Sequence, residues 1–449
     1  MKYLQNLALA LSACTFHVAN AAVIVPGATW KDTSGNIIQA HGGGFLKVGS
    51  DFYWFGEDKV QNSALFKAVS CYKSSDLVSW SRQNDALTPI SGTSISTSNI
   101  VERPKVIFNK ANSEYVMWFH SDTSNYGAAQ VGVATAKSPC GPYTYLSSFK
   151  PLGAESRDMS LFQDDDSSAY LLYASDNNQN FKISKLTSDY HNVASQTSVL
   201  SGSTLEAPGI VKRNGVYYLI ASHTSGWDPN PNKYFTASSL AGPWSSQADI
   251  APSATRTYFS QNAYDLPIGN FAIYMGDRWR PSLLGSSTYI WYPLSWSSGV
   301  PQIVHADVWS LNINAGTYTA ASGTSYEAES GTLSGTAVLA SGSGFSGGKC
   351  VGYLGHGGSV TINNVQGIGG NQWVSLYYAN ADSTWRNTTI SANGGSSILV
   401  DQPNTGGGQT VISVPVLLNL RSGANSITIG ASQSSYAADL DKIVVYTAT

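Results

Sequence analysis

The sequence predicts an all-β protein with two domains, a five-bladed β-propeller followed by a β-sandwich of the jelly-roll type. Charged residues make up only 12% of the 449 residues, whereas the chain contains 43 Gly, 25 Tyr and 12 Trp. This composition is typical of short strands between tight turns. One sequence unit also recurs through the first part of the chain. Because the length exceeds that of one ordinary hydrophobic core, we expect two domains.

Residues 1–21 have the pattern of a secretory signal peptide. Lys2 precedes an apolar segment from about Leu7 to Phe16, and the small residues Ala19 and Ala21 follow. That segment is too short to span a bilayer, and no later segment approaches the ~20 apolar residues that a membrane helix needs. We therefore expect a secreted, extracellular protein with no membrane partner. The formal charge of -3 provides no basic stripe, so we expect no nucleic-acid partner.

The propeller prediction for residues 22–315 rests on a repeated unit. Each copy has a polar residue, a short apolar strand, a turn and an aromatic-rich strand, with a period of roughly 48 to 60 residues. The clearest copies read "VERPKVIFNKANSEYVMWFHS", "SRDMSLFQDDDSSAYLLYAS" and "LEAPGIVKRNGVYYLIAS", and the weaker ones "AHGGGFLKVGSDFYWFGE" and "SQNAYDLPIGNFAIYMGD". A four-stranded unit at this period is typical of a propeller blade, so five copies predict five blades.

Equivalent positions on the inner strands of a propeller face one mouth of its channel. The polar residues that open the repeats are therefore expected to converge, and they are Glu102, Asp158, Glu206 and Gln261. An alternative is that the carboxylates form structural ion pairs with Arg103 or Arg157. Carboxylates gathered in a cleft resist ionising together, which is the condition that acid-catalysed bond cleavage requires.

With these motifs and "SHTSGWDPNPNKYF" and "SLAGPWS", residues 23 to about 315 resemble glycoside hydrolase family 43, and specifically its exo-β-1,3-galactanase branch. The resemblance implies an inverting, secreted exo-β-1,3-galactanase that acts on the β-1,3-galactan of arabinogalactan. It also implies that Glu206 is the general acid and that Asp158 raises its pKa and orients it. An arabinan- or xylan-cleaving enzyme of the same fold, or a galactan-binding propeller lectin without catalysis, are the alternatives.

The region 39–44, "QAHGGG", lacks the Asp that most of the family uses as general base. Gln261, Glu102 and Glu57 are the candidates for holding the attacking water. We favour Gln261 for this role and Glu102 as a binder of the terminal galactose. In an inverting enzyme the water-holding group lies roughly 6.5 to 9.5 Å from the acid. Further expected substrate contacts are Glu57, Tyr126, Asn178, Thr224 and Trp227, although Trp227 could instead pack between blades.

Residues 316–324, rich in small side chains, are expected to form a linker to a module at 325–449. The motifs "YEAE", "GGKCVGYLG", "YANADSTWRNTTISANG" and "LDKIVVY" resemble a carbohydrate-binding module of family 35. The resemblance implies a structural Ca²⁺ held by Glu327, Glu329, Asp441 and the Lys349 carbonyl, since Ca²⁺ prefers hard oxygen ligands. It also implies a sugar site formed by Tyr353, Arg386, Tyr436 and Asp439. No cofactor is expected for catalysis.

Three cysteines remain once Cys14 leaves with the signal peptide. A disulfide between Cys71 and Cys140, both in the first half of the chain, would leave Cys350 free and buried. We expect the mature protein to be a monomer.

Overall fold

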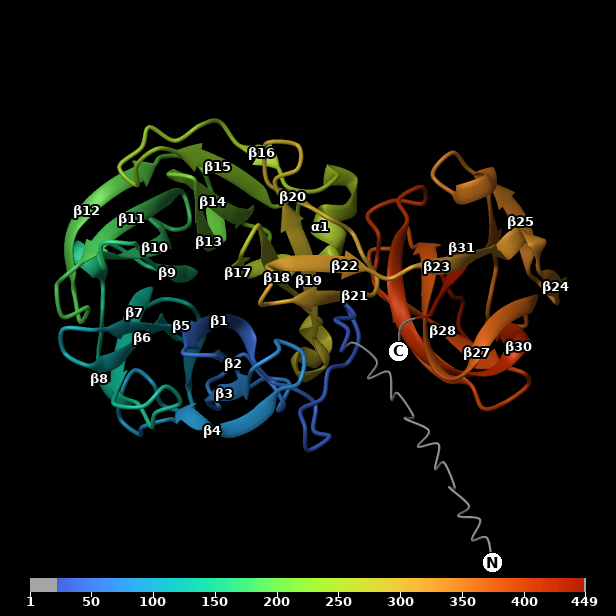
Figure 1. Cartoon of the computed structure of the whole chain (residues 1–449), viewed down its shortest axis with the longest axis horizontal. Coiled ribbons are helices and arrows are strands. Elements are labelled where there is room, and N and C mark those ends of the chain that lie inside the picture. Colours follow the sequence, from blue (N-terminus) through green and yellow to red (C-terminus); the bar gives the residue numbers. More distant parts are fainter. Residues whose placement is uncertain (1–21, 448–449) are drawn as a thin grey trace, which may run out of the picture.

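The computed structural model describes residues 22–447, so the predicted signal peptide lies outside the described residues. Five four-stranded sheets surround a central axis, and a curled sheet follows them at the C-terminal side (Figure 1). The prediction of a five-bladed propeller followed by a second β domain is confirmed. No helix within residues 22–447 is long and apolar enough to cross a membrane.

Each blade is an antiparallel sheet whose strands pair in sequence order. The first blade contains β1 (His41–Val48), β2 (Asp51–Glu57), β3 (Val69–Ser74) and β4 (Ser81–Leu87). The second contains β5 (Asn99–Asn109), β6 (Glu114–Thr123), β7 (Gln130–Ala136) and β8 (Thr144–Phe149). The third contains β9 (Met159–Gln163), β10 (Ala169–Ser175), β11 (Asn180–Leu186) and β12 (Val193–Leu200).

The last two blades have the same order. The fourth contains β13 (Leu205–Arg213), β14 (Val216–His223), β15 (Lys233–Ala237) and β16 (Ala248–Asp249). The fifth contains β17 (Gln261–Ile268), β18 (Phe271–Arg278), β19 (Thr288–Ser295) and β20 (Gln302–Ile303). The loops between strands contain the short helices η1 (Pro151–Gly153), η2 (Ser253–Thr255), α1 (Arg256–Phe259) and η3 (Pro281–Ser286).

Four of the five inner strands are interrupted near their first residues. The pairing register shifts between His41 and Gly44 in β1, between Glu102 and Lys105 in β5, between Glu206 and Gly209 in β13, and between Asn262 and Tyr264 in β17. Such bulges bend a strand and redirect its side chains. The left-handed φ angles of Arg103 and Ala207 accompany two of them. The bulges therefore aim the polar residues at the channel instead of letting them follow the strand alternation.

The propeller closes through its two ends. Ile24 bridges Trp309, which begins β21 (Trp309–Asn312), and β21 pairs with β22 (Thr317–Ala320). The aromatic rings of the first and last blades share one core, whose fully buried members include Trp54, Trp80 and Trp291. The stretch expected to be a linker, 316–324, is largely β-strand, because β22 and the start of β23 (Gly323–Glu327) lie within it. Tyr318 packs against Phe271 and anchors β22 to the propeller.

The C-terminal domain is one nine-stranded sheet that curls around its own core (Figure 1). The long strands β27 (Ser359–Ala379) and β30 (Ile412–Ile429) pair along most of their length and contribute to both layers of the curl. This is how the predicted β-sandwich forms as a continuous sheet. Its other strands are β23 (Gly323–Glu327), β24 (Thr332–Ser334), β25 (Val338–Ser341), β26 (Lys349–Gly352), β28 (Arg386–Ala392), β29 (Ile398–Gln402) and β31 (Asp439–Tyr446), with short helices η4 (Ala328–Ser330) and η5 (Ser346–Gly348).

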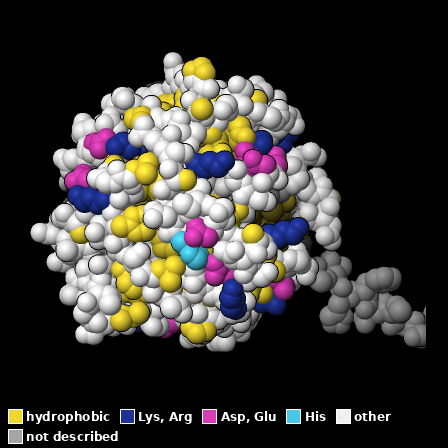
Figure 2. Space-filling model, turned by 90° about the vertical axis from the view of Figure 1, so that its left-hand side faces the viewer, with side chains coloured by type: hydrophobic (Ala, Val, Ile, Leu, Met, Phe, Trp, Pro, Cys, Tyr) yellow, Lys and Arg dark blue, Asp and Glu magenta, His cyan; other side chains and the backbone are white. Residues whose placement is uncertain are grey.

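The two domains are joined by buried polar contacts. The Asp307 carboxylate accepts hydrogen bonds from the Tyr377 and Tyr446 hydroxyls at 2.7 and 2.6 Å, and from the Ser413 hydroxyl. Because breaking such a network would leave a buried charge unpaired, the domains are held in one arrangement. At the far end of the propeller, charged side chains of both signs are scattered without a continuous stripe of Lys and Arg (Figure 2).

The cysteine predictions are confirmed. Cys71 and Cys140 form a disulfide, and Cys350 is free and buried. The disulfide links β3 to the segment after β7, so it joins the first blade to the second.

Candidate active site

A pocket of about 250 Å³ lies where the inner strands converge, and it contains the predicted residues. Its walls are formed by Glu57, Glu102, Arg103, His120, Tyr126, Arg157, Asp158, Asn178, Glu206, Gly226, Trp227, Gln261 and Trp279. A larger cleft of about 670 Å³ lies between the two domains, but its only carboxylate is that of Asp401. We take the smaller pocket as the candidate active site, because acid–base chemistry needs titratable groups that act together.

Glu206, at the start of β13, is only 8% exposed. Burial, followed by the negative charge of Asp158, raises the pKa of Glu206 to about 8. Its Oε1 atom accepts a hydrogen bond of 2.9 Å from the Gln261 amide. This bond and a backbone hydrogen bond from Ser225 both lower the pKa, but burial and Asp158 outweigh them. Glu206 can therefore donate a proton at neutral pH, as a general acid must.

Asp158, just before β9, is held by two donors. The Arg103 guanidinium lies 2.7 Å from its Oδ2 atom, and the backbone N–H of Ala207 donates to the same oxygen at 3.1 Å. The Ala207 bond ties Asp158 to the residue after Glu206. Asp158 thus also forms the ion pair with Arg103 that the alternative interpretation expects. The positive charge of Arg103 opposes the rise in the pKa of Glu206.

Gln261, the first residue of β17, has no hydrogen-bonding capacity left for a water in this arrangement. Its Oε1 atom accepts from Arg103 at 2.7 Å and from the Trp279 indole at 2.9 Å, and its NH₂ group donates to Glu206 and to Ser222. A side-chain amide has two acceptor sites and two donors, so all four are used. The expected separation of 6.5 to 9.5 Å from the acid is also not met, because neighbouring inner strands put the two side chains in direct contact.

Glu102 is a buried and ionised part of the pocket wall. Burial opposes its ionisation, but the contact with His120 and the charge of Lys59 outweigh burial and lower the pKa of Glu102. The Tyr126 hydroxyl donates to its Oε1 atom at 2.9 Å. An ionised carboxylate at a pocket wall is a strong acceptor for a sugar hydroxyl.

His120 connects Glu102 to a second carboxylate. Its Nε2 atom lies 2.8 Å from Asp122, and its Nδ1 atom lies 3.4 Å from Glu102. Burial works against protonation, but the two carboxylates raise the pKa of His120 to about 9. Ligand atoms of Glu102, His120 and Asp158 lie within 4.8 Å of one another. A protonated imidazole has no lone pair for a metal, so this group suits hydrogen bonding better than coordination.

Glu57, the last residue of β2, is tied into the wall. Its Oε2 atom lies 2.8 Å from the buried Lys59 ammonium, and its Oε1 atom accepts from the Arg103 backbone N–H at 2.9 Å. Burial raises the pKa of Glu57, and Lys59 opposes that rise. Glu57 therefore holds the backbone of Arg103 in place. Because both of its oxygens already have protein partners, Glu57 is a weaker candidate than Glu102 for a substrate contact.

Of the loop residues expected to touch substrate, Tyr126, Asn178 and Trp227 line the pocket and Thr224 does not. Trp227 packs edge to face on Trp279 at 4.9 Å, so both the packing and the pocket interpretations hold. The Oδ1 atom of Asn178 is buried without a hydrogen-bond partner among the described residues, which leaves it available to a ligand. Thr224 is exposed because the chain turns outward after β14 ends.

Sequence reasoning missed Trp279 and treated Arg103 only as an ion-pair partner. Arg103 is the residue that joins the site: it contacts Asp158, Gln261 and the Asn262 carbonyl. Its position directly after Glu102, at a bulge before a proline, was the signal that could have identified it. Trp279 follows β18 in "GDRWR", where nothing in the sequence separates it from an ordinary packing residue.

In the C-terminal domain, the residues expected to bind sugar come together. Tyr353 and Tyr436 are 59% and 40% exposed, with ring centres 5.9 Å apart. Arg386 donates to the Ala437 carbonyl at 2.7 Å, and the Asp439 carboxylate lies against Gly352, the neighbour of Tyr353. Exposed aromatic rings beside charged hydrogen-bonding groups suit a sugar ring.

The residues expected to hold Ca²⁺ also lie close to one another. The Ser346 hydroxyl donates to Glu327 at 2.6 Å and to Asp441 at 3.1 Å. Glu329 has a buried Oε2 atom without a hydrogen-bond partner among the described residues, and Lys349 begins β26 directly after η5. Within residues 22–447 none of these three carboxylates forms an ion pair with Lys or Arg, but their oxygens do not all lie within 4.8 Å of one another.

Two family models match the chain. The model for glycosyl hydrolases family 43 matches residues 38–265, and the model for the CBM13 domain of alpha-galactosidase matches residues 360–445. The second match supports a carbohydrate-binding module. It corrects the expectation of a family 35 module, because the matching model is of the CBM13 type.

One curated protein and several solved structures are similar to this chain. A β-D-galactofuranosidase from Aspergillus niger is 30% identical over 196 residues, which cover 39% of this chain and 54% of that protein. The chain thus spans about half the length of that curated relative. The crystal structure of an exo-β-1,3-galactanase from Phanerochaete chrysosporium with β-1,3-galactotriose is 76% identical, covers 94% of this chain and 100% of its own, and has a TM-score of 0.94.

An exo-β-1,3-galactanase from Clostridium thermocellum is 30% identical, with coverage of 87% of this chain and 88% of its own and a TM-score of 0.64. The family model covers more than half of the chain and includes four of the five inner strands in full. With its acidic pocket at the propeller mouth, the chain belongs to glycosyl hydrolase family 43.

Proposed function

We propose that this protein is an exo-β-1,3-galactanase that releases galactose from the non-reducing end of β-1,3-galactan with inversion. The observation that carries the proposal is Glu206, an acid with a pKa of about 8 beside Asp158, in a chain that is 76% identical to a fungal exo-β-1,3-galactanase. The protonated Glu206 donates its proton to the glycosidic oxygen, which is a poor leaving group until it is protonated.

The substrate contacts follow from the walls of the pocket. Glu102, Tyr126 and Asn178 offer hydrogen-bonding groups to the terminal galactose, and Trp227 offers an apolar face. A volume of about 250 Å³ suits the end of a chain, in keeping with release from the terminus. Asp158, Arg103 and Gln261 hold the acid in position. Gln261 can hold a water only after one of its four hydrogen bonds opens.

The C-terminal domain is proposed to bind galactan through Tyr353, Arg386, Tyr436 and Asp439. Its tethering raises the local concentration of the enzyme on polymer without adding a catalytic group. Glu327, Glu329, Asp441 and the Lys349 carbonyl are proposed to hold a structural Ca²⁺. If they do, a chelator will lower the unfolding temperature of the full chain, and added Ca²⁺ but not Mg²⁺ will restore it.

We also propose that the protein is secreted as a monomer after removal of residues 1–21. Sequencing the N-terminus of the protein secreted by a eukaryotic host should give Ala22 as its first residue. Size-exclusion chromatography with light scattering should give the mass of one chain.

The test of the proposed activity is galactose release from β-1,3-galactan by the wild type, Glu206→Gln and Glu155→Gln. Glu155 lies outside the pocket and serves as the matched control. We expect release by the wild type and the control, loss of about 10²–10⁴-fold in Glu206→Gln, and α-galactose as the first product seen by NMR. Release from arabinan or xylan instead, or polymer binding without any release, would replace the proposal by one of its alternatives.

A further inference from the structure

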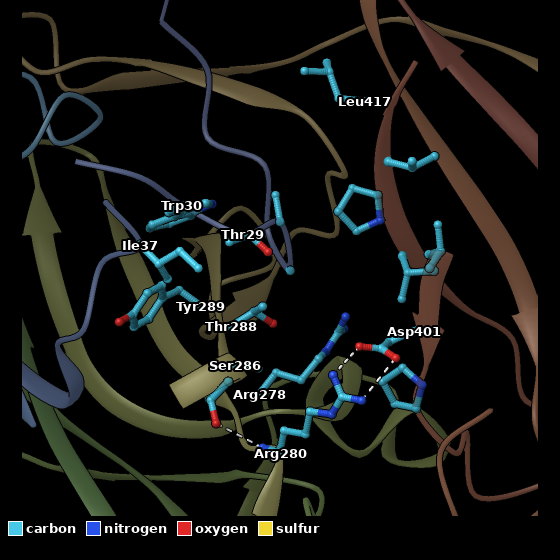
Figure 3. Close-up of a pocket in the computed structure, with 18 of the residues that line it drawn as sticks. Thr29, Trp30, Ile37, Arg278, Arg280, Ser286, Thr288, Tyr289, Asp401 and Leu417 are labelled. Atoms are coloured by element: carbon cyan, nitrogen blue, oxygen red, sulfur yellow. Dashed lines mark hydrogen bonds and ion pairs between the residues drawn. The ribbon is translucent and has the colours of Figure 1, made fainter. Parts of the chain in front are cut away.

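The cleft between the domains has the features of a second ligand site. Its volume of about 670 Å³ falls within the ~300–1,000 Å³ that is usual for small-molecule sites. Trp30, Ile37 and Tyr289 of the propeller line one wall, and Leu417 and Asp401 of the C-terminal domain line the other (Figure 3). A molecule in this cleft would therefore contact both domains at once.

Arg278 projects into this cleft (Figure 3). The residue is only 4% exposed, and two of its nitrogens donate to the backbone carbonyls of Phe259 and Tyr258. Its Nη1 atom has no hydrogen-bond partner among residues 22–447, and no carboxylate of those residues forms an ion pair with Arg278. Nη1 is not among the fully enclosed polar atoms that lack a partner, so it is open to the cleft, where a carboxylate or phosphate could contact it.

The charges that line the cleft favour an anion. Lys31, Arg278 and Arg280 face a single carboxylate, that of Asp401, which already pairs with Arg280. The aromatic rings of Trp30, Trp373 and Trp385 line the same space, and Thr29 and Thr288 contribute hydroxyl groups. Aromatic faces with hydroxyl groups suit a sugar ring, whereas the free guanidinium suits a carboxylate.

We propose that the interdomain cleft binds a sugar unit that carries a carboxylate, a hexuronate, and that Arg278 Nη1 contacts the carboxylate. The choice of a sugar rests on the proposed function, because the chain acts on polysaccharide. The choice of a carboxylate rests on Arg278 alone. The site contains no acid–base pair, so it binds and does not cleave. The cleft would bind acidic regions of a branched polysaccharide, in addition to the galactan binding proposed for the propeller pocket and the C-terminal domain.

Thr288 provides a variant that tests the site without removing a buried residue. It begins β19 and is the direct cross-strand partner of Arg278 on β18. Opposite residues on antiparallel strands lie about 4.5–5.5 Å apart at Cβ, so a glutamate here would pair with Arg278 and occupy its free nitrogen. Thr288→Gln has the same shape without the charge and is the matched control. Arg278→Gln is the direct variant, but it also removes two bonds to the backbone.

The experiment is calorimetric titration of the full-length protein with glucuronate, galactose and acetate. We expect glucuronate to bind Thr288→Gln a few-fold more weakly than wild type, because the Thr288 hydroxyl is lost. Thr288→Glu should bind glucuronate at least tenfold more weakly than Thr288→Gln, because only the glutamate pairs with Arg278. Galactose binding and galactose release should be unchanged in both variants, because neither touches the other sites. Equal glucuronate binding by all three proteins would overturn the proposal.

Acetate separates a sugar site from a general anion site. If acetate binds the wild type as tightly as glucuronate does, and Thr288→Glu weakens both by the same factor, the cleft is a general anion site and the proposal of a sugar ligand is overturned. A normal glucuronate response together with no galactanase activity would refute the proposed function and leave the anion site standing. A crystal soaked with glucuronate should place its carboxylate against Arg278 Nη1.

Discussion

The propeller pocket and the C-terminal domain differ in how far their functional side chains are buried. In the pocket, Glu206, Glu102 and Glu57 are buried. Burial raises the pKa values of Glu206 and Glu57, whereas His120 and Lys59 outweigh burial and lower the pKa of Glu102. In the C-terminal domain the exposed tyrosines form the candidate sugar site, and Glu327 and Asp441 gather around Ser346. Buried carboxylates with divergent pKa values can share acid and base roles, whereas exposed aromatic groups bind without changing the substrate.

The difference comes from the way the two sheets are built. In the propeller, bulges at the starts of inner strands turn polar side chains toward a common axis, where they lose water. In the curled sheet, β27 and β30 pair along most of their length and enclose an apolar core, so polar groups remain at the loops and edges. Chemistry is therefore expected to depend on the pocket alone, and polymer affinity on both domains.

Arg103→Met should give the largest effect on this contrast. Arg103 is buried and contacts Asp158 and Gln261, so we expect kcat to fall by about 10²-fold because the acid loses its orientation. The free energy of unfolding should fall by about 3–5 kcal/mol, since Asp158 loses its partner. Because the Arg103 charge opposes the raised pKa of Glu206, the alkaline limb of activity should move to higher pH. The control variant Arg213→Met should leave the alkaline limb at the wild-type pH. An alkaline limb at the wild-type pH in Arg103→Met as well would contradict the effect of Arg103 on the pKa of Glu206.

Glu102→Gln should act mainly on substrate affinity. Hydrogen bonds to a charged group contribute about 1.5–3 kcal/mol, so KM should rise by about 10- to 100-fold, with a smaller change in kcat. Tyr126→Phe removes a hydroxyl that donates to Glu102 and is proposed to contact galactose, but it keeps the Glu102 charge and should raise KM by only a few-fold. Steady-state kinetics on a galactan oligosaccharide measure both. A fall in kcat at constant KM for Glu102→Gln would move this residue from binding to chemistry.

Tyr436→Ala should give the smallest effect, and only on polymer. Covering one aromatic side chain contributes about 1.5–3 kcal/mol, so galactan binding should weaken by about tenfold or more. Turnover of a short oligosaccharide should be unchanged, because Tyr436 lies in the other domain. Affinity electrophoresis in galactan, beside a kinetic assay, tests the contrast directly. Loss of short-substrate turnover would show that the two regions are coupled.

The sequence predicted what repeats and local patterns encode. The five blades, the convergence of Glu102, Asp158, Glu206 and Gln261 and the Cys71–Cys140 disulfide all follow from spacing in the chain. It could not predict the four hydrogen bonds of Gln261, because their partners come from β5, β13, β14 and the segment after β18. Trp279 was missed for the same reason.

The small-residue content of 316–324 predicts a linker, but one tyrosine decides the structure of this stretch. Tyr318 pairs β22 with β21 and packs on Phe271, so most of the expected linker is sheet. Thr224 was likewise expected at the pocket from its motif, but it does not line the pocket, whereas Gly226 and Trp227 in the same loop after β14 do. Individual contacts of this kind depend on where a loop turns, which composition does not specify.

The most direct test of the central claim is the pH dependence of kcat/KM on a β-1,3-galactan oligosaccharide. Glu206 works in its protonated form, and its raised pKa of about 8 keeps it protonated through neutral pH. The account predicts that kcat/KM stays high up to neutral pH and falls tenfold per pH unit above about pH 8. A fall that begins near pH 4 to 5, where an ordinary glutamate ionises, would contradict the assignment of Glu206 as a buried general acid.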